Sequence, residues 1–187
     1  RLLGDIEQSK NRIERLLLNE DFSSIKSDLR LELIKIELDQ GNIDFSIESL
    51  DRIAQDYPNT KVAIEAYYIL SKLYLESPNL DFEKSNFFMN EAMKQNANSS
   101  HKVLISNKRE SVSKLIELDI TLKEEGDIEK SSILYRMGEI LAFDLGNLND
   151  SITYFEDIAN NYQKSAIFSS ATFALYSIHS TLNDSRE

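Results

Sequence analysis

Apolar residues recur along most of the chain at intervals of three or four residues, and short polar turns separate these periodic stretches. This spacing places apolar side chains on one face of an α-helix, as with Ala63, Ala66 and Leu70 in residues 61–76. No stretch shows the period of two that indicates a β-strand. The pattern predicts about nine antiparallel helices and no sheet, over residues 2–18, 24–40, 44–56, 61–76, 81–96, 101–125, 129–145, 148–161 and 165–182.

The predicted helices are bounded by residues that typically end or begin helices. Gly41 follows the second helix, where a glycine can take the positive φ that ends a helix. Pro58 follows the third helix and has no amide hydrogen with which to continue it. Thr60 can cap the fourth helix, and three residues can each cap the second: Asp21, Ser23 and Ser24.

One segment of the chain occurs twice. Residues 41–60 and 146–165 align without a gap at an offset of 105 residues, so that Gly41 matches Gly146 and Tyr57 matches Tyr162. Self-similarity at a fixed spacing is typical of a stacked repeat array, and this offset corresponds to about three units of roughly 34 residues. We therefore expect the two segments to form equivalent helix pairs. Gly138 lies inside a predicted helix, and we expect a close contact between helices there.

The composition excludes several classes of protein. Hydrophobic residues make up 41% and charged residues 28%, as in a folded protein and unlike a disordered tail. The formal net charge of −11 argues against nucleic acid as a partner, because binding phosphates requires an excess of Lys and Arg. The absence of cysteine excludes disulfides and thiolate zinc sites. No apolar run is long enough to predict a transmembrane segment.

The sequence contains few candidates for chemistry. His101 and His179 are far apart, and neither has a second histidine at metal-ligand spacing. The acidic stretch 117–129 lacks the spacing and central glycine of a calcium loop, which makes a solvated face the better interpretation. Phosphate-binding loops and nucleophile elbows are absent. We expect no enzymatic activity, no catalytic residue, no metal site and no cofactor.

Several of these positions match a known repeat. The matches are Gly41, Ser46, Leu50 and Pro58 in one unit, Tyr67, Leu70, Ser71, Tyr74, Ser85 and Ala92 in the next, and Leu134, Met137, Gly138, Ser151 and Phe155 in the last complete unit. This pattern resembles the tetratricopeptide repeat (TPR) family, whose unit is a helix–turn–helix of 34 residues. The sequence departs from the family pattern at Ile53, Ile158 and Gln163, and residues 98–130 do not form a clean unit.

The resemblance implies a right-handed α–α superhelix, a TPR-like solenoid that occupies residues 1–187 as one domain. We expect the sequence to be a fragment of a longer protein and its last helix to leave one apolar side uncovered. The stretch 56–74 is similar to bacterial cell-envelope members of the family, such as the outer-membrane β-barrel assembly lipoprotein and the Tol-Pal-associated repeat protein. That similarity implies a location in the periplasm or at the outer membrane, with the cytoplasm as the alternative.

The resemblance also implies a non-catalytic scaffold that binds a protein or peptide in its concave groove. The alternative function is a structural spacer or an oligomerisation domain. Aromatic and lysine positions in the groove favour a peptide with apolar anchors and some acidic character, unless these rings only pack against the next helix. The family register places ten residues in the groove: Leu31, Lys35, Leu38, Tyr68, Lys72, Leu75, Tyr135, Glu139, Phe143 and Phe173.

Overall fold

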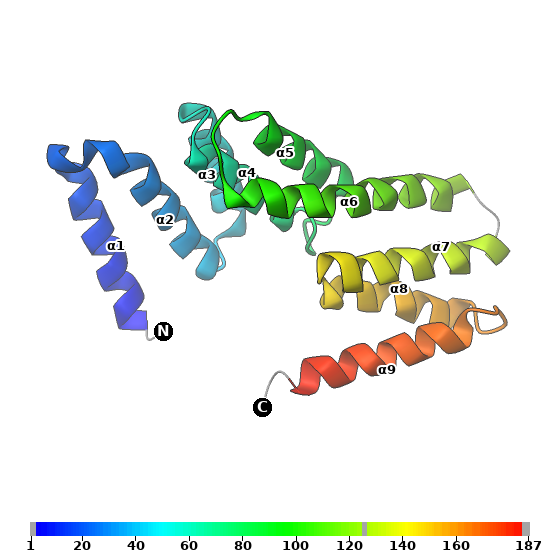
Figure 1. The fold of residues 1–187 in the computed structure, drawn as a ribbon. Coiled ribbons are helices and arrows are strands. Elements are labelled where there is room, and N and C mark those ends of the chain that lie inside the picture. The colour runs from blue at the N-terminus through cyan, green and yellow to red at the C-terminus, as the bar shows by residue number, and fades with distance from the viewer. Residues whose placement is uncertain (1–2, 125–126, 185–187) are drawn as a thin grey trace. The chain divides into compact units, whose positions relative to one another are not determined.

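The computed structural model describes residues 3–124 and 127–184, and every regular element in these ranges is helical (Figure 1). The prediction of an all-α protein is therefore confirmed for the described residues. Nine α-helices correspond one to one with the predicted helices: α1 Leu3–Leu18, α2 Lys26–Asp39, α3 Ile43–Asp56, α4 Lys61–Leu73, α5 Phe82–Lys94, α6 Ser100–Glu124, α7 Asp127–Glu139, α8 Leu148–Asn161 and α9 Phe168–Asp184. The predicted positions of Leu2, Glu125 and Gly126 lie outside the described residues.

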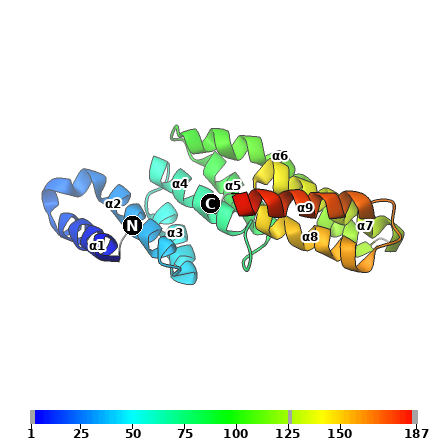
Figure 2. The same ribbon diagram turned by 90° about the horizontal axis from the view of Figure 1, so that it is seen from below.

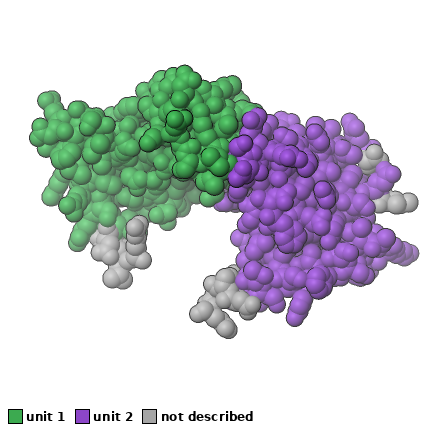
Figure 3. Space-filling model, viewed as in Figure 1, with its two compact units in different colours: residues 1–72, 87–105 green, residues 73–86, 106–187 purple. Residues whose placement is uncertain are grey.

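The chain divides into two compact units, which Figure 3 shows in different colours. Unit 1 comprises residues 1–72 and 87–105, and unit 2 comprises residues 73–86 and 106–187. The division falls within α5 and α6 and before the last residue of α4, so these helices contribute to both units.

In unit 1, α1 packs against α2 and α2 packs against α3, as the antiparallel ribbons in Figures 1 and 2 show. Leu50 and Leu70 are fully buried and form part of the core. The ring of Tyr67 on α4 stacks on Phe88 of α5 with 6.0 Å between centroids. Burial of these large apolar side chains supplies most of the favourable free energy of folding.

Unit 2 contains a three-helix layer in which α8 contacts both α7 and α9 (Figure 2). Its core includes Phe155 and Ile158 of α8, together with Ala171 of α9. Gly138 of α7 lies against this core, because a Cβ atom placed there would be 2.7 Å from Cζ of Phe155. The predicted close helix contact at Gly138 is confirmed.

The two repeated segments have the same local structure. Helices α3 and α8 each contain 14 residues and occupy equivalent positions in the 105-residue alignment. Gly41 and Gly146 precede them with φ angles of 84° and 76°, in the region that glycine adopts readily. Helices α3 and α8 are thus equivalent in length and alignment position, whereas the equivalence of the two segments as helix pairs stays a prediction.

The helices that lead into these glycines end differently. The amide of Asn42 donates to the carbonyl of Glu37, five residues back, whereas the amide of Asn147 donates to the carbonyl of Leu141, six residues back. The hydrogen bond of Asn147 spans one residue more because a π-helical turn forms at Ile140–Leu145, where the periodicity predicted a regular helix. The π turn shifts the sequence register of α7 relative to α2 by one residue.

The predicted caps are correct at one helix and wrong at another. Thr60 caps α4, because its hydroxyl accepts a hydrogen bond of 3.2 Å from the amide of Ala63. None of the three predicted residues caps α2, which begins after Ile25 without a side-chain cap. A 3₁₀ turn at Glu20–Ile25 occupies that position, and the side chain of Asn19 caps this turn instead.

Candidate functional site

Four polar residues follow one face of α4 in unit 1. Lys61, Glu65, Tyr68 and Lys72 are separated by four, three and four residues, so they share one side of the helix, which we call the α4 face. Each of the four is exposed or half-buried. The opposite side carries the buried residues of α4, which fix the orientation of the helix in the core.

An ion pair joins the α4 face to α2. Nζ of Lys35 lies 2.9 Å from Oε1 of Glu65, and it also pairs with Glu32 on its own helix. Burial opposes the charge on Lys35, but the hydrogen bonds with Glu32 and Glu65 outweigh it and raise the pKa of the lysine. The charge of Lys35 is therefore already compensated, which leaves other lysines to attract an acidic partner.

A stacked pair of rings joins the α4 face to the start of α6. The Tyr68 and His101 rings lie 4.9 Å apart at 30°. Beside them is a cavity of about 700 Å³, lined by Lys61 and Glu65 of α4 and by residues 98–103. This arrangement places the stacked rings beside an open recess whose lining is polar except for Val103.

The predicted groove residues of unit 1 are only partly accessible. Lys72 is exposed, and Lys35, Leu38 and Tyr68 are half-buried. The placement of Leu31 in the groove is wrong, because it is 2% exposed and belongs to the core. The assignment failed because α2 carries apolar residues on two sides. The sequence alone does not show which of these sides neighbouring helices cover.

Sequence reasoning missed three residues of this site: Lys61, Glu65 and His101. The helical spacing from Tyr68 to Lys61 and Glu65 could have identified the first two. His101 was considered only as a metal ligand or as an acid–base group, and no sequence signal indicates that it stacks on a tyrosine 33 positions earlier.

One of the predicted groove residues in unit 2 is buried, and a second is half-buried against the core. Leu75 is 5% exposed, so its assignment to an open groove is wrong. Tyr135 packs edge-on against the fully buried Phe155, with 5.5 Å between ring centroids. Burial and the neighbouring Glu139 carboxylate raise the pKa of Tyr135. For Tyr135, packing against the next helix is therefore the better interpretation.

The other predicted positions of unit 2 are at its surface. Glu139 is half-buried and lies 3.7 Å from Nη1 of Arg136, while Phe143 and Phe173 are 72% and 71% exposed. Tyr176, one turn after Phe173 on α9, is 72% exposed. These two rings are exposed on a side of α9 that is otherwise polar, so the expectation that the last helix leaves an apolar side uncovered stays a prediction. Five of the ten predicted residues lie in each unit, so a single continuous strip stays a prediction.

The described ranges contain no helix with the length and apolar character of a membrane span. Within the same residues, no group of three His, Asp or Glu side chains is placed to hold a metal ion. Comparison with family models, curated proteins and solved structures finds no match to this chain. The resemblance to the TPR family therefore rests on the sequence positions given above.

Proposed function

We propose that the chain is a non-catalytic scaffold that binds a partner peptide on the α4 face of unit 1. In this proposal the helix pairs stack as a TPR-like right-handed superhelix, and α2, α4 and α6 present their exposed sides to the partner. The peptide supplies an apolar anchor, which lies in the cavity beside Tyr68 and His101. It also carries acidic residues, which pair with lysines at the edge of the cavity.

The stacked Tyr68–His101 pair at the 700 Å³ cavity is the observation that carries this proposal. Tyrosine is enriched among the residues that dominate binding energy at interfaces. Lys61 and Lys72 are exposed on the same helix face, and Lys102 lines the cavity. This local concentration of lysines contrasts with the formal net charge of −11 of the whole chain, which favours an acidic peptide over a basic one.

A peptide-display selection against the full chain tests the proposal. We expect the selected peptides to combine acidic residues with at least one large apolar residue. Fluorescence anisotropy then gives their affinities for the wild-type chain and for variants. Tyr68→Ala should weaken binding by about 1–3 kcal/mol, which is the range of aromatic hot spots. Lys72→Glu should weaken peptide binding more at low ionic strength than at high, because salt screens exposed charges.

Lys114→Glu is the matched control, since Lys114 is an exposed lysine of α6 in unit 2 and belongs to neither the cavity nor the α4 face. A thermal melt of each variant checks that the fold is retained. Selected peptides that bind Tyr68→Ala and Lys72→Glu as tightly as the wild type would place their site elsewhere and refute the proposal.

Two exposed aromatic residues of α9 favour a second candidate function, oligomerisation or spacing. Phe173 and Tyr176 are large aromatic residues at high exposure, and such residues often lie in interfaces between subunits. Sedimentation velocity separates the two functions. A dimer that Phe173→Asp and Tyr176→Asp dissociate, together with no peptide binding at the α4 face, would favour oligomerisation.

A further inference from the structure

A histidine lines the cavity in which we place the peptide. His101 is half-buried at the start of α6, where it borders the cavity of about 700 Å³ and stacks on Tyr68. Its Nδ1 lies 3.2 Å from the hydroxyl of Ser99, which also accepts a hydrogen bond of 3.2 Å from the amide of His101. Among the described residues, none forms a hydrogen bond with Nε2 of His101. This second ring nitrogen is therefore available to a group of the peptide.

The contacts of His101 are compatible with both of its charge states. A hydroxyl both donates and accepts hydrogen bonds, whereas an imidazole nitrogen accepts when it carries no proton and donates when it carries one. The hydroxyl of Ser99 can thus donate to Nδ1 of the neutral ring and accept from Nδ1 of the charged ring. The face of a tyrosine ring attracts a cation, so a charge on His101 does not oppose the stack on Tyr68. The imidazole can therefore gain a proton without moving.

Two lysines and one glutamate line the cavity together with His101. Lys61 and Glu65 belong to α4, and Lys102 follows His101 on α6. The other lining residues carry no charge. Glu65 is already paired with Lys35 of α2 at 2.9 Å, so the two lysines of the lining give the cavity a positive charge. A proton on His101 adds a further positive charge, and the carboxylates of an acidic peptide compensate all three.

Histidine differs from the other charged residues of the cavity in the pH range over which its charge changes. An imidazole ordinarily gains its proton between about pH 8 and 5. The carboxylates of a peptide keep their negative charge above about pH 5.5, and lysines keep their positive charge well above pH 8. The chain contains two histidines, and the other, His179, is exposed on α9 in unit 2. A change of pH in this range therefore alters the charge of the cavity through His101.

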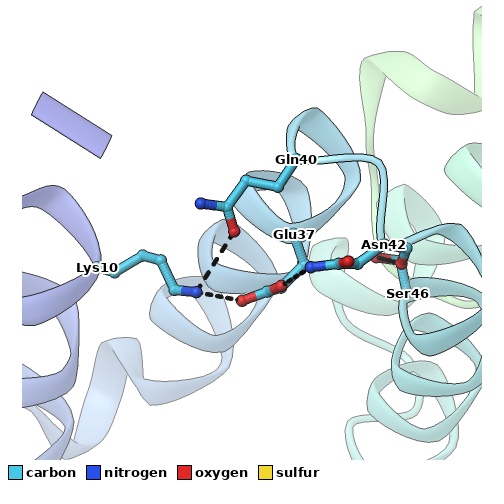
Figure 4. Close-up of polar contacts among 5 residues, drawn as sticks. All are labelled: Lys10, Glu37, Gln40, Asn42 and Ser46. Carbon is cyan, nitrogen blue, oxygen red and sulfur yellow. Dashed lines mark hydrogen bonds and ion pairs between the residues drawn. The ribbon is translucent and has the colours of Figure 1, made fainter. Parts of the chain in front are cut away.

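Another charged network of unit 1 keeps its charges over the same range. Figure 4 shows the ammonium of Lys10 of α1 at 2.5 Å from Oε1 of Glu37, while the side-chain amide of Asn42 donates to Oε2 of Glu37 at 2.6 Å. The hydrogen bonds with Lys10 and Asn42 lower the pKa of Glu37 from its ordinary value of 4.5, and the bond with Glu37 raises the pKa of Lys10. This network therefore supplies no pH dependence in the range in which an imidazole titrates.

We propose that protonation of His101 strengthens the binding of the acidic peptide at the α4 face, so that the site is regulated by pH. This inference rests on the function proposed above and specifies how that same site is controlled. The charged ring stays on Tyr68 and donates from Nε2 to a carboxylate of the peptide. Because the coupling between two bound species is reciprocal, the bound peptide raises the affinity of His101 for its proton by the same factor.

Fluorescence anisotropy with the tightest-binding peptide from the display selection measures this coupling. The affinity for the full chain is determined at about pH 5.5 and about pH 7.5, at the same low ionic strength. We expect binding to be about two- to fivefold tighter at the lower pH, which is the effect of one accessible charge pair. An analogue of the peptide in which Asn and Gln replace Asp and Glu should bind with the same affinity at both pH values.

Variants of the two histidines identify the group that gains the proton. His101→Gln should remove the pH dependence, because its side chain stays neutral. His101→Arg should also bind equally at both pH values, because a guanidinium is always charged and can stack on an aromatic ring. His179→Gln is the matched control and should keep the wild-type dependence, since His179 lies on α9 in unit 2. The readout is the ratio of the two affinities, so a variant that binds more weakly at both pH values still reports the coupling.

Proton NMR of the wild-type chain measures the same coupling without a substitution. The imidazole C–H resonances of the two histidines are followed as the pH is changed, with and without saturating peptide. We expect the peptide to move the titration midpoint of His101 upward by about 0.3–0.7 of a pH unit, the logarithm of the expected change in affinity. The midpoint of His179 should stay where it is.

The inference and the function on which it rests fail in different ways. A selection that yields no peptide, or only peptides that Tyr68→Ala binds as tightly as the wild type does, overturns the proposed function and this inference together. Peptides that Tyr68→Ala releases, but that bind the wild type equally at both pH values, overturn the inference alone. A pH dependence that His101→Gln retains does the same, because another group would then gain the proton.

Discussion

The closest helix contact in unit 2 can be tested by adding a single methyl group. Gly138→Ala places a Cβ atom 2.7 Å from Cζ and 2.8 Å from Cε1 of Phe155. Carbon atoms that are not bonded pack at about 3.5–4.0 Å, so the ring or the helix has to move by roughly an ångström. The Phe155 ring is fully buried in the core. The substitution therefore strains the packing of α7 on α8.

Two opposing terms set the size of the effect. Overpacking of a well-packed core costs about 1–3 kcal/mol. Alanine is more favourable than glycine inside a helix by up to about 1 kcal/mol, which offsets part of this cost. We expect a net loss of about 1–2 kcal/mol in the free energy of unfolding. For a chain of this length that corresponds to a melting temperature lower by about 2–8 °C.

Circular dichroism at increasing urea concentration and temperature measures this loss. A second variant, Phe155→Leu, removes the atoms that the new methyl group would meet, so the double variant should lose about 1 kcal/mol less than the sum of the single variants. Ser132→Ala, on an exposed position of the same helix, should stay within about 0.5 kcal/mol of the wild type. The reasoning is refuted if Gly138→Ala raises the stability, or if the two substitutions show no coupling.

Three further predictions concern the same units. Burial, with Asp119 and Asp150 nearby, raises the pKa of Tyr154 to about 12, above its ordinary value of 10.0. The unfolded chain then loses this proton first as the pH rises, so the free energy of unfolding should fall between about pH 10 and 12, by at most about 2–3 kcal/mol. Urea titrations at several pH values should show a smaller fall for Tyr154→Phe, and an equal fall would contradict the assignment. Asp150→Ala leaves the amide of Ser77 without its acceptor and should cost about 1–3 kcal/mol, with faster hydrogen exchange at Ser77; unchanged exchange there would mean that the bond contributes nothing. Tyr135→Ala should lower the melting temperature more than Tyr68→Ala, because Tyr135 packs on the core of unit 2 and Tyr68 stacks at the surface; equal losses would place both rings in the core.

Much of the fold could be predicted because local rules determine it. The glycine turns at Gly41 and Gly146 follow from backbone conformation alone, and the helical period of the apolar residues identifies all nine described helices. Gly138 could be predicted as a contact because a glycine inside a helix is costly unless a neighbour requires it. The turns and helices depend on residues close in sequence, and the contact at Gly138 depends only on the need for a small residue there.

The candidate site could be predicted only in part, because exposure depends on which helix covers which side. The family register placed Leu31 and Leu75 in a groove, yet both are buried by neighbours that the register does not specify. The π turn at Ile140–Leu145 is a second reason, since one extra residue in a turn rotates the preceding helix relative to its counterpart. His101 reaches Tyr68 only through the tertiary structure.

A comparison of equivalent residues in α3 and α8 distinguishes positions that the fold constrains from positions that depend on other local contacts. Ser46 and Ser151 are both fully buried, and Ile53 and Ile158 are both buried, because each pair packs within its own unit at an equivalent position of α3 and α8. Phe45 and Asp150 are also equivalent, but one is an exposed ring and the other a buried carboxylate that binds the amide of Ser77. The fold does not require either residue, since the same helix forms with both. The difference follows the local contacts, because Asp150 accepts a hydrogen bond from Ser77 whereas Phe45 lines a cavity between α1, α2 and α3.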